Sequence, residues 1–262
     1  MTSANAGNVD VYYVEHGSGQ PVLVLHGAGV DHREAEACFE PAFSRLRGFR
    51  RIYPDLPGMG RTPAPGTLRS ADDVLDELFR FAEAVCGRDG YLVVGHSAGA
   101  HYARAMAGTR PERVKGLAMV CPLLPGIRDV PEHRAVVETD GIGDDGFRSY
   151  FVVQTPEMLE RYERYIAPAA ALADWAALGR IGERWEFTDH LAAPYAGPTL
   201  VIAGRQDATV DYAAAVDAAR EHPHATLAVL AEAGHALPHE QAGLLQSLLA
   251  EWATRVGHPS PG

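Results

Sequence analysis

The chain has 262 residues, of which 47% are hydrophobic and 22% charged, and its formal net charge is −11 at pH 7. This composition is typical of a globular protein with one sizeable core, and α/β proteins of this length commonly form a single domain. The acidic balance disfavours nucleic acid or an anionic membrane as a partner, because both bind basic surfaces.

Cysteine use and the N-terminus narrow the class further. Cys38, Cys86 and Cys121 lie far apart and form no C-x-x-C motif, so they predict neither a disulfide framework nor a metal site. Residues 1–8 are polar and lack the apolar core of a signal peptide. No run approaches the roughly 18 apolar residues of a transmembrane helix, so we expect a cytoplasmic protein.

Strand and helix patterns alternate through the first half of the chain. Short β-rich or apolar runs predict strands at 9–15, 22–25, 50–54, 91–94 and 114–120. Apolar spacing near 3.6 residues predicts helices at 33–46, 74–85 and 100–107, and Ser70 followed by Asp73 resembles an N-cap. Apolar strands between helices indicate a mainly parallel sheet that is covered on both faces.

The alternation stops between Pro122 and Tyr195. This segment contains helical stretches near 156–166 and 169–178, and no convincing buried strand. The α/β pattern then resumes with strands at 199–203 and 226–230 and helices at 212–220 and 240–256. We therefore predict an α/β core formed by residues 1–121 and 196–262, with 122–195 inserted as a mostly helical lid. At about 75 residues, a separate small domain is the alternative.

The sequence Gly95-His96-Ser97-Ala98-Gly99 follows the apolar strand and precedes an Ala-rich helical pattern. Strand, tight turn and helix form the context of a nucleophile elbow, in which the turn presents the serine hydroxyl above the sheet edge. The two glycines fit this interpretation because strand and helix backbones pass too closely there for a Cβ. The alternative is a chance Gly/Ser turn.

A serine hydroxyl needs a base within hydrogen-bond reach, and the base needs an orienting carboxylate. His235 follows the last predicted strand, and Asp207 follows the strand at 199–203, so both lie where parallel sheets place their sites. We predict Ser97 as nucleophile, His235 as base and Asp207 as acid, with a Ser97 Oγ to His235 nitrogen distance of about 2.6–3.2 Å. Asp211 and Asp189 are rivals for the acid.

Five segments together carry a family resemblance, namely His26-Gly27, Asp55-Leu56-Pro57-Gly58-Met59-Gly60, Gly95-His96-Ser97-Ala98-Gly99, Gly204-Arg205-Gln206-Asp207 and Ala233-Gly234-His235. With the order Ser, Asp, His, the chain resembles the α/β-hydrolase superfamily in its serine-nucleophile branch of esterase-, lactonase- and thioesterase-like enzymes. The resemblance implies an eight-stranded, mostly parallel sheet with a cap inserted after the sixth strand. It also implies that the backbone N–H of Ala28 joins that of Ala98 in an oxyanion hole.

Other residues have two possible roles. His26 and His96 have the positions of structural hydrogen-bonding residues, although histidine is a common base. His101 lies one turn beyond Ser97, where it can face the pocket or pack beneath the lid. The other predicted pocket residues are aromatic side chains of the insertion that can equally pack the lid onto the core, namely Tyr150, Tyr162, Trp175 and Trp185.

These features favour a serine hydrolase that cleaves an ester, thioester, lactone or related acyl bond of a small molecule and needs no cofactor. The same three residues can also serve C–C bond hydrolysis, perhydrolysis or acyl transfer. A non-catalytic small-ligand receptor on this fold is a third hypothesis.

Overall fold

The computed structural model of the chain describes residues 2–126, 130–188 and 194–257. A sheet of eight strands lies at its centre, in the order β1-β2-β4-β3-β5-β6-β9-β10. The strands are β1 (Thr2–Asn5), β2 (Asp10–Gly17), β3 (Gln20–Leu25), β4 (Phe49–Pro54), β5 (Tyr91–His96), β6 (Val114–Val120), β9 (Thr199–Gly204) and β10 (Ala225–Leu230). From β4 to β10 all neighbouring strands are parallel, whereas β2 runs antiparallel to both of its neighbours, β1 and β4.

The apolar runs of the sequence became the central strands. Every residue of β5 and β9 is buried, as expected for parallel strands covered on both faces. The polar edge strand β1 lies in a segment where we predicted no strand. It forms because its backbone pairs with β2, a contact that its own residues do not encode.

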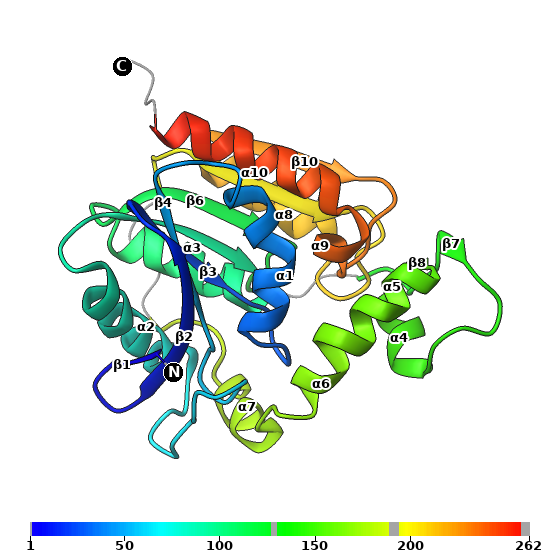
Figure 1. Cartoon of the computed structure of the whole chain (residues 1–262), viewed down its shortest axis with the longest axis horizontal. Helices are drawn as coiled ribbons and strands as arrows, with labels where there is room; N and C mark the ends of the chain where they lie inside the picture. The colour runs from blue at the N-terminus through cyan, green and yellow to red at the C-terminus, as the bar shows by residue number, and fades with distance from the viewer. Residues whose placement is uncertain (1, 127–129, 189–193, 258–262) are drawn as a thin grey trace.

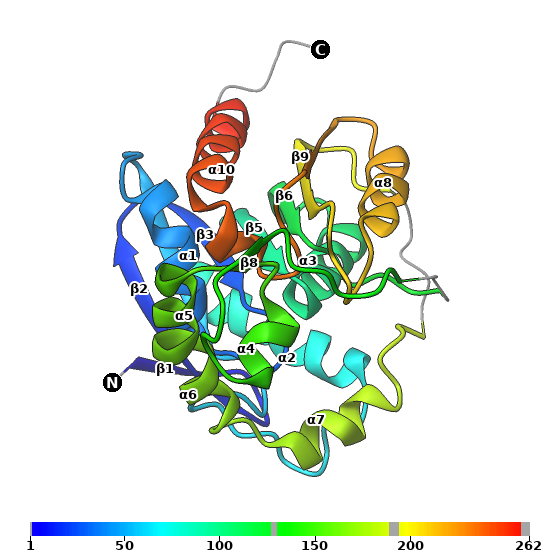
Figure 2. The same cartoon turned by 90° about the vertical axis from the view of Figure 1, so that its right-hand side faces the viewer.

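Helices cover both faces of the sheet (Figures 1 and 2). The helices of the core are α1 (His32–Phe43), α2 (Ala71–Cys86), α3 (Ala98–Thr109), α8 (Tyr212–Glu221), α9 (Leu237–Glu240) and α10 (Ala242–Gly257). One apolar cluster buries α1 and α10 against one face, and a second buries α2, α3 and α8 against the other. The predicted α/β fold class is therefore confirmed.

Helix boundaries follow local chemistry. The Ser70 side chain accepts a hydrogen bond from the Asp73 N–H at 3.2 Å and caps α2, as predicted. The helix α1 ends at Phe43, before the predicted 46. The helix predicted at 240–256 is α10, which begins at Ala242, and a short helix that was not predicted, α9, precedes it.

The segment between β6 and β9 lies at the end of the sheet toward which the parallel strands point (Figures 1 and 2). Its elements are β7 (Val137–Glu138), α4 (Asp145–Tyr150), β8 (Val153–Gln154), α5 (Pro156–Arg161), the π-helical turn η1 (Tyr162–Ile166), α6 (Ala167–Ala170) and α7 (Trp175–Gly182). The helix predicted at 169–178 is wrong, because a turn separates α6 from α7 and Asp174 caps the latter. The short β7–β8 pair was not predicted.

A third apolar cluster fastens this inserted segment to the core. Phe147, Phe151 and Met158 pack there with Val30, which precedes α1, and Ala236, which follows His235. The segment thus contacts the loop that carries Ala28 and the loop that carries His235. Its action as a lid stays a prediction, as does the division of the chain at 121 and 196. Among the described helices, none combines the length and apolar character needed to cross a membrane.

Candidate active site

Ser97 occupies a strained turn between β5 and α3. Its φ and ψ are 54° and −117°, in a region that non-glycine residues rarely adopt. A Cβ on Gly99 would lie 2.2 Å from the Leu25 carbonyl oxygen, and one on Gly95 would lie 2.3 Å from the Gly99 carbonyl oxygen. The glycines therefore allow the close backbone approach that the motif predicts, and the turn has the geometry of a nucleophile elbow.

The structure brings Ser97, His235 and Asp207 together from three loops. The Ser97 hydroxyl donates to His235 Nε2 over 2.9 Å, within the range predicted from the sequence. His235 Nδ1–H donates to Asp207 Oδ2 over 2.8 Å. All three side chains are buried, so the chain of hydrogen bonds is shielded from water. This geometry can transfer a proton from the hydroxyl to the imidazole while a carboxylate holds the ring.

Asp207 is fixed by more than His235. Its Oδ1 accepts hydrogen bonds from the backbone N–H groups of Thr209 at 2.8 Å and Val210 at 3.0 Å. Burial raises the pKa of this carboxyl, but the hydrogen bond and charge of His235, together with the two amides, bring it below its usual value. Its rival Asp211 begins α8 instead, and Asp189 lies outside the described residues.

The loop after β3 passes directly over the elbow. A Cβ on Gly27 would lie 3.4 Å from the Ser97 Cβ, so the chain just before Ala28 touches the nucleophile. His26 holds this loop by donating from Nδ1 to the Gly27 carbonyl at 2.7 Å and accepting the Leu56 N–H at Nε2 at 2.9 Å. In the described part of the chain, the N–H groups of Ala28 and Ala98 make no internal hydrogen bond. Both amides therefore stay candidates for an oxyanion hole.

His96 connects the elbow to the base. Its Nε2–H donates to the His235 carbonyl oxygen at 3.1 Å. Burial, together with the nearby charge of His235, lowers the pKa of His96 to about 4, so the ring is neutral at neutral pH. The side chain thus has the structural type of contact that the sequence indicates.

The five predicted pocket residues fall in different places. Tyr150 is half-buried, and its ring meets that of His235 edge-on at 6.1 Å. Trp175 is 60% exposed, and its ring covers Gly29 beside the loop that carries Ala28. These two side chains therefore border the Ser97 region from the inserted segment.

The other three pack the inserted segment. His101 stacks on Phe187 at 4.3 Å, and its Nε2–H donates to the Trp185 carbonyl at 2.9 Å, while the Trp185 ring lies 5.1 Å away. Burial lowers the pKa of His101 to about 4. Tyr162 packs on Phe147 and Phe151 inside the third cluster. Their observed contacts are packing contacts, and a pocket role for them stays a prediction.

The sequence analysis did not identify Glu240 or the buried pair of His239 and Glu34 beside it. The Glu240 carboxylate accepts hydrogen bonds from the backbone N–H groups of Gly234 and of two residues at the start of β8. His239 contacts Glu34 of α1 and Arg161 of α5. The only sequence signal for Glu240 is its place five residues after His235, because its partners are backbone groups that no side-chain pattern reveals.

Within the described residues, potential metal ligands also approach one another in three places, each within 4.8 Å. Two of the groups are Glu34 with Cys38 and His239, and Asp31 with His32 and Asp55. The Arg161 cation donates to His239 in the first, and the Asp55 carboxylate accepts from His32 Nδ1–H at 2.7 Å in the second. These protein hydrogen bonds account for both. The third group contains His235, whose ring nitrogens Ser97 and Asp207 occupy.

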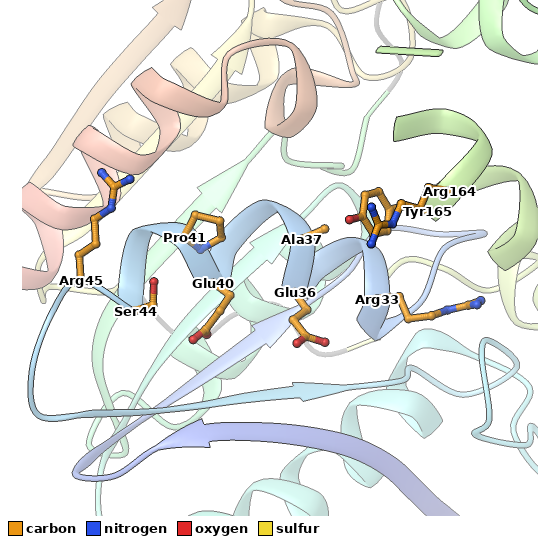
Figure 3. Close-up of a pocket in the computed structure, with 9 residues that line it drawn as sticks. All are labelled: Arg33, Glu36, Ala37, Glu40, Pro41, Ser44, Arg45, Arg164 and Tyr165. Carbon is orange, nitrogen blue, oxygen red and sulfur yellow. The ribbon is translucent and has the colours of Figure 1, made fainter. Parts of the chain in front are cut away.

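A separate groove of about 660 Å³ runs along α1 to Arg164 and Tyr165 of η1 (Figure 3). Figure 3 shows Arg33, Glu36 and Glu40 on the α1 side of it. None of the residues that line this groove belongs to the Ser97 site.

Comparison with known proteins agrees with the fold. The model of the alpha/beta hydrolase family matches residues 22–245. Over 117 residues the chain is 31% identical to the 2-hydroxy-6-oxo-6-(2'-aminophenyl)hexa-2,4-dienoic acid hydrolase of Metapseudomonas resinovorans, which covers 44% of the chain and 40% of that protein. A crystal structure of an alpha/beta superfamily hydrolase from Oenococcus oeni has a TM-score of 0.89 at 24% identity and covers 98% of the chain and 100% of its own.

Other relatives differ in how much of their length they share. Over 272 residues the chain is 26% identical to the 2-hydroxy-6-oxononadienedioate/2-hydroxy-6-oxononatrienedioate hydrolase of Burkholderia vietnamiensis, which covers 94% of the chain and 91% of that protein. By contrast, the chain spans only 40% of the Metapseudomonas resinovorans hydrolase, and 49% and 44% of two further curated relatives.

Proposed function

Because the chain belongs to the alpha/beta hydrolase family, we propose that it is a serine hydrolase that cleaves an ester, thioester, lactone or related acyl bond of a small molecule. The observation that carries the proposal is the continuous hydrogen-bond chain from Ser97 through His235 to Asp207, at 2.9 Å and 2.8 Å. The strained φ of 54° at Ser97 also supports the proposal, because such backbone strain clusters at functional sites.

The first half of the reaction forms an acyl-enzyme. His235 Nε2 takes the hydroxyl proton while Ser97 Oγ attacks the substrate carbonyl carbon. Asp207 stabilises the resulting imidazolium and holds the ring in the tautomer whose Nε2 is free to accept. The N–H groups of Ala28 and Ala98 stabilise the oxyanion of the tetrahedral intermediate. His235 then protonates the leaving group as the intermediate collapses.

The second half releases the acid. His235 removes a proton from water, whose oxygen attacks the acyl carbon, and the new tetrahedral intermediate collapses to return the proton to Ser97 Oγ. Burial of the triad favours both halves, because a fixed carboxylate and imidazole interact more strongly away from bulk water.

The inserted segment supplies the substrate contacts in this proposal. Tyr150 packs edge-on against His235, and Trp175 presents an exposed ring beside the loop of Ala28. Two aromatic side chains at the border of the site favour a substrate with an apolar or aromatic portion.

A second candidate is hydrolysis of a C–C bond in a 2-hydroxy-6-oxo dienoic acid by the same triad. It is favoured by two relatives whose names describe hydrolases of such acids, one of which aligns with 94% of the chain. The candidates differ in the bond that is cleaved, whereas the roles of Ser97 and His235 in them are the same.

Labelling with a fluorophosphonate tests the shared mechanism. The wild-type protein is expected to form one adduct, which Ser97→Ala abolishes and His235→Ala strongly slows. Ser247→Ala is the matched control, because this exposed serine donates only to the Gly243 carbonyl within α10. Wild-type protein that carries no Ser97-dependent adduct would refute the serine-hydrolase proposal. Turnover of p-nitrophenyl esters, thioesters and lactones beside a 2-hydroxy-6-oxo dienoic acid then decides between the two candidates.

A further inference from the structure

The helix α9 begins two residues after His235, and its last residue is Glu240. We propose that Glu240 is a positioning residue that ties the loop of the base to the inserted segment, so that the placement of His235 depends on the placement of β8. This inference rests on the proposed function, since it assigns a role to the base, and it goes beyond the triad itself.

The two oxygens of Glu240 have different partners. Oε2 accepts the Gly234 N–H at 2.7 Å, directly before His235. Oε1 accepts the N–H of Val152 at 2.7 Å and that of Val153 at 3.1 Å, at the start of β8. One carboxylate therefore bridges two backbone segments that lie more than 80 residues apart in the chain.

Only a carboxylate fits this arrangement well, because all three partners are donors and an ionised carboxylate offers two accepting oxygens. A glutamine would keep one accepting oxygen and turn its NH₂ group toward a donor. Burial raises the pKa of Glu240, whereas the three amides favour its ionised form. The side chain is partly buried, so water replaces lost partners only in part.

Close packing also ties the loop of His235 to the inserted segment. A Cβ on Gly234 would lie 2.8 Å from Val152 Cγ1, and a Cβ on Gly204 would lie 2.3 Å from the Gly234 carbonyl oxygen. The base loop is thus held between the end of β9 and the inserted segment, with no room for a side chain on either side. A displacement of Val152 acts on Gly234 both through this contact and through Glu240.

A second tie holds α9 to the inserted segment through His239. Arg161, the last residue of α5, donates from Nε to His239 Nδ1 at 2.9 Å. Because arginine only donates, His239 carries its proton on Nε2 and donates it to Glu34 Oε1 at 3.0 Å. Burial raises the pKa of Glu34, but the hydrogen bond that it accepts from His239 brings it down to about 2. The ionised Glu34 thereby fixes α9 from the core side.

Glu240→Gln tests the proposal, with Glu40→Gln as the matched control. Glu40 is also a partly buried carboxylate that joins two elements, because it accepts from Arg51 Nε at 3.1 Å and Tyr53 Oη–H at 2.8 Å and ties α1 to β4 away from the base. For Glu240→Gln we expect kcat for an ester to fall about 10- to 100-fold with KM changed less than about threefold, the loss that a displacement near 1 Å causes. For Glu40→Gln we expect kcat within about twofold of wild type at a comparable loss in unfolding midpoint.

A proton NMR spectrum reads the position of His235 without turnover. The wild type is expected to show the hydrogen-bonded Nδ1–H of His235 as a downfield resonance, which His235→Ala removes. We expect Glu240→Gln to broaden this resonance through faster exchange with water, and Glu40→Gln to leave it unchanged. Glu240→Asp keeps the charge on a shorter side chain and serves in the same way if Glu240→Gln does not fold.

The outcomes are distinct. A sharp resonance and wild-type kcat in folded Glu240→Gln or Glu240→Asp overturn the positioning role. A kcat that falls only in proportion to the unfolded fraction, as in the control, overturns it as well. Failure of wild-type protein to label at Ser97 overturns the proposed function instead, and the resonance then still decides whether Glu240 holds His235.

Discussion

Asp207→Asn is the substitution that most directly tests how the acid acts. In the wild type, Oδ1 accepts two backbone N–H groups and Oδ2 accepts His235 Nδ1–H. An asparagine has one accepting oxygen, and the amides of Thr209 and Val210 hold it in place of Oδ1. Its NH₂ group then faces His235 Nδ1, where it can only donate.

This donor selects the other tautomer of His235. Nδ1 becomes the acceptor, so the ring proton moves to Nε2 and points at Ser97 Oγ. The imidazole then has no free lone pair for the hydroxyl proton, and the imidazolium loses its carboxylate. Trading this carboxylate for an amide in a serine protease triad lowers kcat by about 10⁴, which corresponds to about 5.5 kcal/mol of transition-state stabilisation. We expect a loss of the same order here.

The kcat for hydrolysis of a p-nitrophenyl ester at pH 7 measures this loss, and Ser97→Ala defines the background rate. Circular dichroism should show a folded variant, since asparagine has nearly the size of aspartate and keeps the two backbone bonds. Activity within about tenfold of wild type would refute the tautomer argument. It would mean that a different carboxylate orients His235.

Two further predictions concern the border of the site and its packing. Trp175→Ala should raise KM for aryl esters about fivefold and change kcat less than threefold. The free energy of unfolding should change by about 0.5 kcal/mol only, since Trp175 is 60% exposed. Leu172→Ala is the control, because Leu172 is 58% exposed, and an unchanged KM in Trp175→Ala speaks against a substrate contact. His101 has a folded pKa of about 4, below the 6.5 of the unfolded chain, so the unfolded state binds more protons between these values and stability falls as pH drops. Between pH 7 and 5 the free energy of unfolding should fall by about 2 kcal/mol through His101, and urea unfolding should no longer detect this loss in His101→Phe. An equal loss in both proteins contradicts the lowered pKa of His101.

The sequence predicts those parts of the fold that each segment determines by itself. The apolar strands, the Ser70 cap and the elbow glycines are local, and each appears where the pattern indicates. The edge strand β1 and the break between α6 and α7 depend on other segments, so periodicity does not reveal them. Helix propensity continues through 171–174, but tertiary contacts there favour a turn.

The site divides in the same way. Ser97, Asp207 and His235 are predictable because each follows a strand that points to the same sheet edge, and the structure brings their side chains into contact. Which aromatic residues of the insertion approach that edge is not predictable, because it depends on how helices without a buried strand pack. Glu240 is hidden for a related reason, since all three of its partners are backbone amides.

Backbone strain gathers at this same edge. Among the described residues, the non-glycine residues with positive φ are Ser97, Cys121 and Asp211, at 54°, 45° and 62°. Ser97 follows β5, Cys121 follows the neighbouring β6, and Asp211 closes the loop that begins after β9 and carries Asp207. Cys121 is held by its N–H, which donates to the Ile202 carbonyl at 2.8 Å, so the sheet itself maintains the strain. Such conformations each cost of order 1–3 kcal/mol and persist only where surrounding structure enforces them. Their concentration in the segments that follow three adjacent strands fits a backbone shaped to present the Ser97 hydroxyl and the Asp207 loop to His235, at a cost that the buried sheet offsets.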